Sequence, residues 1–155
     1  MSQIKSLSPL DGRYSRSTQD LADIFSEYGL IKHRVFVEVE WLKFIIQDLK
    51  LVEFISSDLD KIDNIVTEFS IDDANVVKDI EKRTNHDVKA VEYFIKDKLD
   101  KFGFSEIKEW VHFSCTSDDI NNISYALMLE KGTRLAIDLL DDFIGKLEEK
   151  ALAYK

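Results

Sequence analysis

Apolar positions recur every three or four residues along most of the chain, the spacing that places them on one face of an α-helix. The clearest series is Val35, Val39, Leu42, Ile46 and Leu49. Alternating valines from position 35 to 39 would suit a strand, but the helical series runs further and no turn residue interrupts it. We therefore predict a helix over 27–50. Because other apolar residues fall on its remaining faces, it should be buried on more than one side.

Residues that can cap a helix N-terminus mark where the other helices should begin. The predicted starts are Ser17 (a short helix to about Phe25), Ser26, Ser57 and Ser70. Asn85 is predicted to cap a fifth helix, which Gly103 ends in the left-handed conformation. With one proline and five glycines in 155 residues, little in the chain would interrupt such helices. The pattern predicts an all-α fold.

The last predicted helix is much longer than the others. Thr116 or Ser117 should cap it, with acidic residues in its first turn. A heptad seam then follows, with steps of three and four, through Ile123, Ala126, Glu130, Thr133, Ile137, Leu140, Ile144, Leu147, Ala151 and Tyr154. About 38 residues would form a rod of roughly 57 Å, so its C-terminal half should pack on something beyond this domain.

No helix-ending residue precedes Lys155, so the pattern suggests an N-terminal piece of a longer protein. We expect a helical N-terminal domain over 1–116 and, over 117–155, the truncated start of a long helix of a central bundle.

Composition narrows the function classes. Hydrophobic residues make up 45% of the chain and charged residues 33%, a balance typical of globular proteins. The net charge of −9 disfavours nonspecific nucleic-acid binding and binding to anionic membranes, and no apolar run is long enough to span a bilayer. The single cysteine excludes an intramolecular disulfide. We expect a cytoplasmic protein with neither nucleic-acid nor membrane partners.

Three polar clusters could carry chemistry. The first, Gly12-Arg13-Tyr14, offers planar guanidinium donors suited to phosphate or carboxylate, although its residue types alone favour a surface turn. The second, residues 84–87, places Asn85, His86 and Asp87 at a helix start, where backbone N–H groups favour an anion. His86 could also shuttle a proton. The alternative for this cluster is simple helix capping.

The third cluster spans residues 112–117. His112 precedes Thr116 and Ser117, two hydroxyls beside the free N–H groups of a helix start. They could hold a carboxylate or phosphate, or merely cap the helix; two aspartates that follow would repel an anion unless they point away. The three histidines lie 53 and 26 positions apart, and no glycine-rich nucleotide motif is present. The residues therefore predict neither a metal site nor a cofactor.

These clusters lie in longer motifs that resemble a known family. Residues 8–14 (SPLDGRY), 83–94 (RTNHDVKAVEYF) and 112–122 (HFSCTSDDINN) are similar, in order and spacing, to the bacterial-type adenylosuccinate lyase family of the fumarase/aspartase superfamily. The resemblance covers essentially the whole chain. It implies a carbon–nitrogen lyase of purine biosynthesis that needs no cofactor. It also implies an all-α homotetramer with active sites built from three subunits.

The resemblance also implies substrates and residue roles. The family eliminates fumarate from adenylosuccinate, giving AMP, and from SAICAR, giving AICAR. By matching motif, Arg13 and Tyr14 should contact the nucleotide, and Asn85, His86 and Asp87 should line its pocket, with His86 assisting catalysis. Thr116 and Ser117 should hold the succinyl carboxylate, and His112 matches an auxiliary active-site histidine.

The family's main catalytic groups, a general-acid histidine and a serine on a flexible loop, should lie beyond residue 155. We therefore expect the chain to be inactive alone. The alternatives are another lyase of the superfamily, such as argininosuccinate lyase or fumarase, or a noncatalytic helical interaction module.

Overall fold

The computed structural model describes residues 7–54 and 58–154, and over this part of the chain every regular element is helical. The predicted all-α fold is therefore confirmed. The α-helices are α1 (Gln19–Phe25), α2 (Glu27–Gln47), α3 (Leu59–Thr67), α4 (Ile71–Thr84), α5 (Asp87–Phe102) and α6 (Ser117–Ala153). Two short 3-10 helices, η2 (Ser15–Ser17) and η4 (Lys108–Trp110), lie in the connecting segments.

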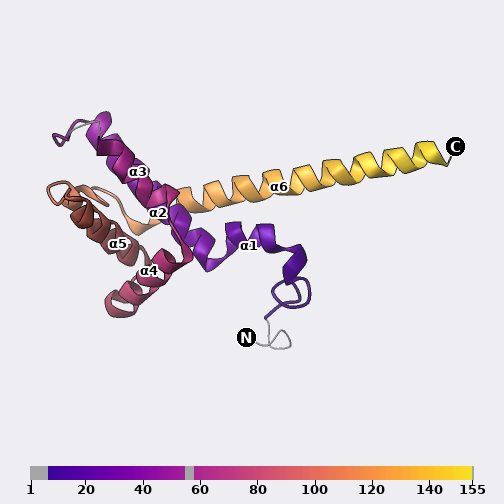
Figure 1. Cartoon of the computed structure of the whole chain (residues 1–155), viewed down its shortest axis with the longest axis horizontal. Coiled ribbons are helices and arrows are strands. Elements are labelled where there is room, and N and C mark those ends of the chain that lie inside the picture. The colour runs from indigo at the N-terminus through magenta and orange to yellow at the C-terminus, as the bar shows by residue number, and fades with distance from the viewer. Residues whose placement is uncertain (1–6, 55–57, 155) are drawn as a thin grey trace.

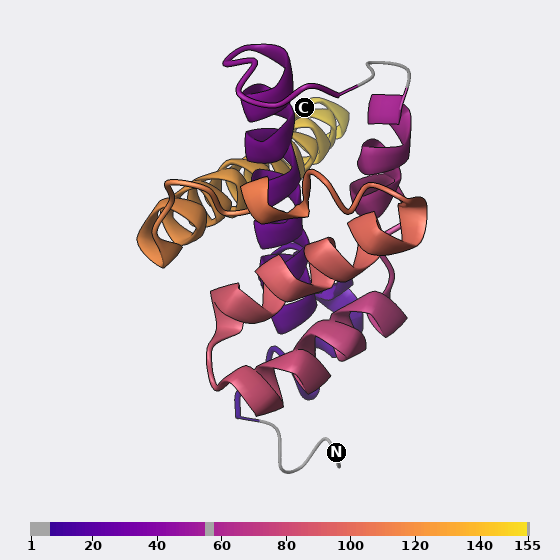
Figure 2. The same ribbon diagram turned by 90° about the vertical axis from the view of Figure 1, so that its left-hand side faces the viewer.

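Helix α2 runs through the middle of the molecule and contacts each of the other α-helices. Helices α4 and α5 lie side by side and cross α2, as Figure 2 shows. The main core fills the space between α2, α3, α4 and α5; its fully buried side chains include Leu42, Ile62, Ile95, Leu99 and Ile107. As predicted, α2 is buried on more than one side.

Three of the predicted helix starts are confirmed by their caps. The Ser26 hydroxyl accepts a hydrogen bond from the Gly29 N–H, and Ser70 forms a capping box with Asp73. Thr116 forms a second capping box at the start of α6. Each cap satisfies backbone N–H groups that the first helical turn leaves without a partner.

Two other predicted starts had different outcomes. Ser17 was wrong as a cap, because the chain forms the short helix η2 there and α1 begins only after Thr18, without a side-chain cap. Ser57 lies outside the described residues, and α3 begins at Leu59.

The junction between α4 and α5 also corrects the prediction for Asn85. Helix α4 continues to Thr84, and Asn85 ends it with a left-handed backbone (φ 52°), which asparagine tolerates better than most residues. His86, not Asn85, is the N-cap of α5. The other end of α5 follows the prediction, since Gly103 is left-handed (φ 84°).

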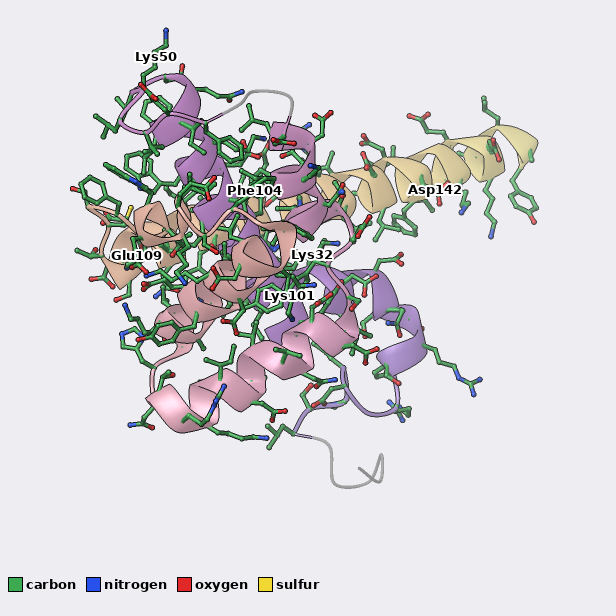
Figure 3. The ribbon with its side chains drawn as sticks, turned by 60° about the vertical axis from the view of Figure 1, so that its left-hand side comes forward. Lys32, Lys50, Lys101, Phe104, Glu109 and Asp142 are labelled. Carbon is green, nitrogen blue, oxygen red and sulfur yellow. The ribbon has the colours of Figure 1, made fainter. Side chains whose placement is uncertain are left out.

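Helix α6 projects far beyond the rest of the molecule (Figure 1). Its first half packs on α1 and α2 and buries Ile120, Ser124, Met128 and Gly132. Beyond Gly132 no residue of the helix is buried, and the part of α6 that carries Asp142 lies beyond the remaining helices (Figure 3). Within the described part of the chain, no helix combines the length and apolarity needed to cross a membrane.

Candidate functional site

The site is organised by two charged residues in the middle of α2. Arg34 is 4% exposed and Glu38 is fully buried, and the two lie one helical turn apart. Buried charges are costly unless hydrogen-bonded partners compensate them. Their partners lie in the second polar cluster and in or just after the third, so α2 brings together segments that are far apart in the sequence.

Arg34 links the start of α5 to the second turn of α6. Its terminal nitrogen Nη2 donates to Asp87 Oδ2 at 2.7 Å, and its Nε donates to Asn121 Oδ1 at 2.9 Å. Desolvation acts to raise the pKa of Asp87, but the Val88 N–H and the Arg34 guanidinium outweigh it and hold that pKa below its usual value. Asp87 is therefore ionised at neutral pH, and a charge-assisted pair fixes the two helix starts relative to each other.

Glu38 holds the histidine of the third cluster. Its Oε1 lies 2.6 Å from Nδ1 of His112, while its Oε2 has no hydrogen-bond partner among the described residues. Burial raises the pKa of Glu38, and the nearby His112 partly offsets this. His112 itself has a left-handed backbone (φ 63°) and keeps about a fifth of its side chain exposed.

A small apolar cluster supports these polar contacts. Val37, Val88 and Ile120 are buried against one another, and each directly precedes or follows a residue of the site or its cap in the chain. Packing of these three side chains fixes how α2, α5 and α6 approach one another. The geometry around Arg34 therefore rests on close-packed side chains as well as on hydrogen bonds.

His86 caps α5 with its ring. Nδ1 accepts a hydrogen bond from the Lys89 N–H at 3.2 Å, so Nδ1 carries no proton and Nε2 must be the protonated nitrogen. The 3.6 Å approach of Nδ1 to Asp87 is consequently not an ion pair. The ring, about half exposed, borders an open hollow of about 510 Å³ that Asn85 and Asp87 also line. His86 can thus offer an Nε2–H donor beside a helix N-terminus.

In the third cluster, the cap of α6 is formed by the Thr116 hydroxyl together with the side chain of Asp119. Thr116 donates its hydroxyl and its backbone N–H to Asp119 Oδ2, each at 2.8 Å. These two hydrogen bonds hold the pKa of Asp119 below its usual value. Asp119 therefore turns back onto the cap, and an anionic ligand would have to displace it to reach Thr116. Ser117 begins α6 and is partly buried.

Cys115 is not an activated nucleophile. Desolvation, together with the charges of Glu38 and Asp119, raises its pKa to about 11, so the thiol stays protonated at neutral pH. It packs against the small apolar cluster. No group of three or more His, Cys, Asp or Glu side chains within residues 7–54 and 58–154 could hold a metal ion. What the site offers is hydrogen-bond donors at helix starts, which suit an anionic ligand.

Known proteins place the chain in a family. Residues 12–155 match the family described as Lyase. The chain belongs to this lyase family. An adenylosuccinate lyase of Buchnera aphidicola from Schizaphis graminum is 44% identical over 160 residues, which cover 100% of this chain and 35% of the relative. The adenylosuccinate lyase of Escherichia coli K12 is 47% identical over 134 residues, covering 84% of this chain and 29% of the relative.

The adenylosuccinate lyase of Haemophilus influenzae is also similar, with 47% identity over 133 residues, which cover 83% of this chain and 29% of the relative. These similarities confirm the resemblance that the three motifs indicated. The chain spans about a third of the length of these relatives.

The described contacts join only two of the three clusters of this lyase chain. Arg34 connects Asp87 of the second cluster to Asn121, which follows the third. Arg13 and Tyr14 lie exposed in the arm before α1, where the Arg13 guanidinium covers the Tyr14 ring at 4.6 Å and donates to its hydroxyl. No described contact joins this arm to the other clusters.

Sequence reasoning missed Arg34 and Glu38. A signal was present, because two charged residues one turn apart interrupt a helix whose other positions are mostly apolar. A charge inside a helix that is buried on several sides requires a buried partner. The sequence does not identify that partner, since Arg34 reaches residues 53 and 87 positions away.

Proposed function

We propose that this chain is the N-terminal part of an adenylosuccinate lyase, which eliminates fumarate from adenylosuccinate to give AMP and from SAICAR to give AICAR. The observation that carries the proposal is the Arg34 bridge, which joins Asp87 and Asn121 of two motifs shared with this family. A helical interaction module would not need a buried guanidinium to join two ligand-binding motifs.

The reaction requires a base that removes a carbon-bound proton and an acid that protonates the leaving nitrogen. The electrons of the broken C–H bond form the C=C bond of fumarate, and those of the C–N bond stay on nitrogen. We place both proton-transfer groups outside this chain. Within it, His86, Asn85 and Asp87 line the nucleotide pocket, with His86 assisting catalysis through its Nε2–H.

The remaining site residues would bind the anionic ends of the substrate. Thr116 and Ser117 hold the succinyl carboxylate, which replaces Asp119 as the acceptor of the Thr116 hydroxyl. Arg13 and Tyr14 bind the nucleotide phosphate. Because they lie on a separate arm, they would complete the pocket of a neighbouring subunit, in keeping with a site composed from three subunits of a tetramer.

The proposal includes the organisation of the whole enzyme. Residues 1–116 form the N-terminal helical domain, and residues 117–155 begin a helix of the central bundle, whose exposed seam would pack in the tetramer. We place the enzyme in the cytoplasm, and its partners are the substrates and further copies of itself.

Complementation tests this proposal. The chain is mixed with the full-length Buchnera relative inactivated at the positions aligned with Arg13 and His86, and fumarate release is followed with adenylosuccinate, SAICAR, argininosuccinate and malate. We expect activity with the first two substrates only. Activity with argininosuccinate or malate would identify another lyase of the superfamily. If the components co-sediment and release no fumarate, the noncatalytic module is the better account.

A further inference from the structure

Glu38 is a buried carboxylate with an unusual environment. It is fully buried, it contacts His112 Nδ1 at 2.6 Å through one oxygen, and its other oxygen has no partner among the described residues. Glu92, the other buried carboxylate, is paired with both Lys89 and Lys96. A buried carboxylate oxygen without a hydrogen-bond partner lowers the stability of the fold. Proteins keep such unfavourable groups where a functional site needs them.

Within the part of the chain that the structure describes, His112 is the one basic side chain that contacts Glu38. On α2, the Arg34 guanidinium is engaged by Asp87 and Asn121. On α5, Glu92 is negative and acts to raise the pKa of Glu38 further. From the connector, Cys115 contributes a protonated thiol.

This contact determines which ring nitrogen of His112 faces Glu38, and that nitrogen is Nδ1. Where Glu38 is ionised, its carboxylate only accepts hydrogen bonds, and Nδ1–H of His112 is then the donor. The left-handed backbone of His112, unusual for a residue other than glycine, shows that its neighbours hold it firmly in this place.

We infer that Glu38 is a positioning residue of the lyase site: it holds the ring of His112 through Nδ1 and leaves the other ring nitrogen, Nε2, available to the ligand. The ligand class, a carboxylate or phosphate, rests on the proposed function. The Glu38–His112 pair itself does not.

Nuclear magnetic resonance on the 155-residue chain tests the pair directly. We expect the Nδ1-bound proton of His112 to resonate far downfield in the parent chain, as short charge-assisted hydrogen bonds require. In Glu38→Gln it should move upfield or vanish, and in the matched control Glu92→Gln it should stay. Absence of the downfield proton in the folded parent, or its persistence in Glu38→Gln, would overturn the inference. The parent measurement decides the matter even if a variant does not fold.

Kinetics of the complemented mixture test the functional consequence. Glu38→Gln should lower the rate of fumarate release by roughly tenfold to a hundredfold, the loss seen where a carboxylate that orients a metal-bound histidine is removed. Glu38→Asp, which keeps the charge, should recover part of it. A Glu38→Gln rate equal to that of Glu92→Gln would overturn the positioning role. If the components of the parent mixture co-sediment and release no fumarate, the proposed function fails, while the resonance of His112 still tests the Glu38–His112 contact.

Discussion

Arg34 is buried and connects two helix starts. Its replacement should lower the free energy of unfolding as well as the activity. Arg34→Met removes the donor to Asn121 Oδ1 and to Asp87 Oδ2, while Asp87 keeps the Val88 N–H on its other oxygen. Because about half of the Asp87 side chain remains exposed and can regain water, we expect a loss of roughly 1–3 kcal/mol in the free energy of unfolding, below the full cost of breaking a buried pair.

The loss should depend on pH. The folded protein holds the pKa of Asp87 below its usual value, so this pair stabilises the fold at neutral pH and the contribution disappears as pH falls through the folded pKa. Urea unfolding of the parent and Arg34→Met should therefore give curves that converge in acid. Arg34→Lys serves as the comparison, because lysine keeps the positive charge but lacks the planar guanidinium that donates to two partners at once. A difference that is constant across pH would show that Asp87 is not the partner that matters.

The sequence predicted the position of those site residues whose hydrogen-bond partners are neighbours in the chain. His86, Thr116 and Asp87 stand in short polar segments at helix starts, and the structure places all three there. The cap of α5 was predicted one residue too early, at Asn85 instead of His86, because either side chain can cap a helix and only the backbone decides which residue becomes left-handed. Arg34 and Glu38 depend on the crossing of α2 with α5 and α6, which no local pattern encodes.

At the scale of helices, the approach of α1 to α2 depends on a glycine. A Cβ at Gly29 would overlap the backbone carbonyl of Ile24, which cannot move without displacing α1. Gly29→Ala should therefore lower the free energy of unfolding by about 1–3 kcal/mol, the usual cost of overpacking.

Gly145 provides the matched control for this helix substitution. A Cβ there has no neighbour within 4 Å, so Gly145→Ala should stabilise α6 by up to about 1 kcal/mol. Chemical denaturation of both variants checks the pair of predictions. Equal effects of the two substitutions would mean that the α1–α2 contact is not close.

Helix periodicity was a sound guide to the elements themselves. The capping boxes of Ser70 and Thr116 and the left-handed Gly103 mark element ends as predicted, because each satisfies backbone groups through neighbours in sequence. Ser17 failed as a cap, since a 3-10 turn over Ser15–Ser17 uses the same backbone and shifts the start of α1.

At the scale of the whole molecule, the outer half of α6 exposes a row of large apolar residues. Among them are Ile137, Leu140, Ile144 and Leu147, all at least half exposed. Exposed apolar seams of this length favour association. We expect sedimentation of the parent chain to show self-association that increases with concentration.

Substitution of the seam should abolish this association. The variant Leu140→Gln with Ile144→Gln and Leu147→Gln should sediment as a monomer at the same concentrations. The control, Asp142→Asn with Glu149→Gln, alters the opposite face of the helix and should associate like the parent. A parent chain that is monomeric throughout would contradict the prediction.

The central claim is that the motifs joined by Arg34 supply this chain's share of a lyase site. The most direct test is fumarate release from adenylosuccinate by the complemented mixture, with the parent chain compared with His86→Asn. Asparagine can still cap α5 but lacks the Nε2–H donor. The account predicts restored activity with the parent chain and at least about tenfold less with His86→Asn. Equal activity with both chains, each shown to co-sediment with the relative, would contradict it.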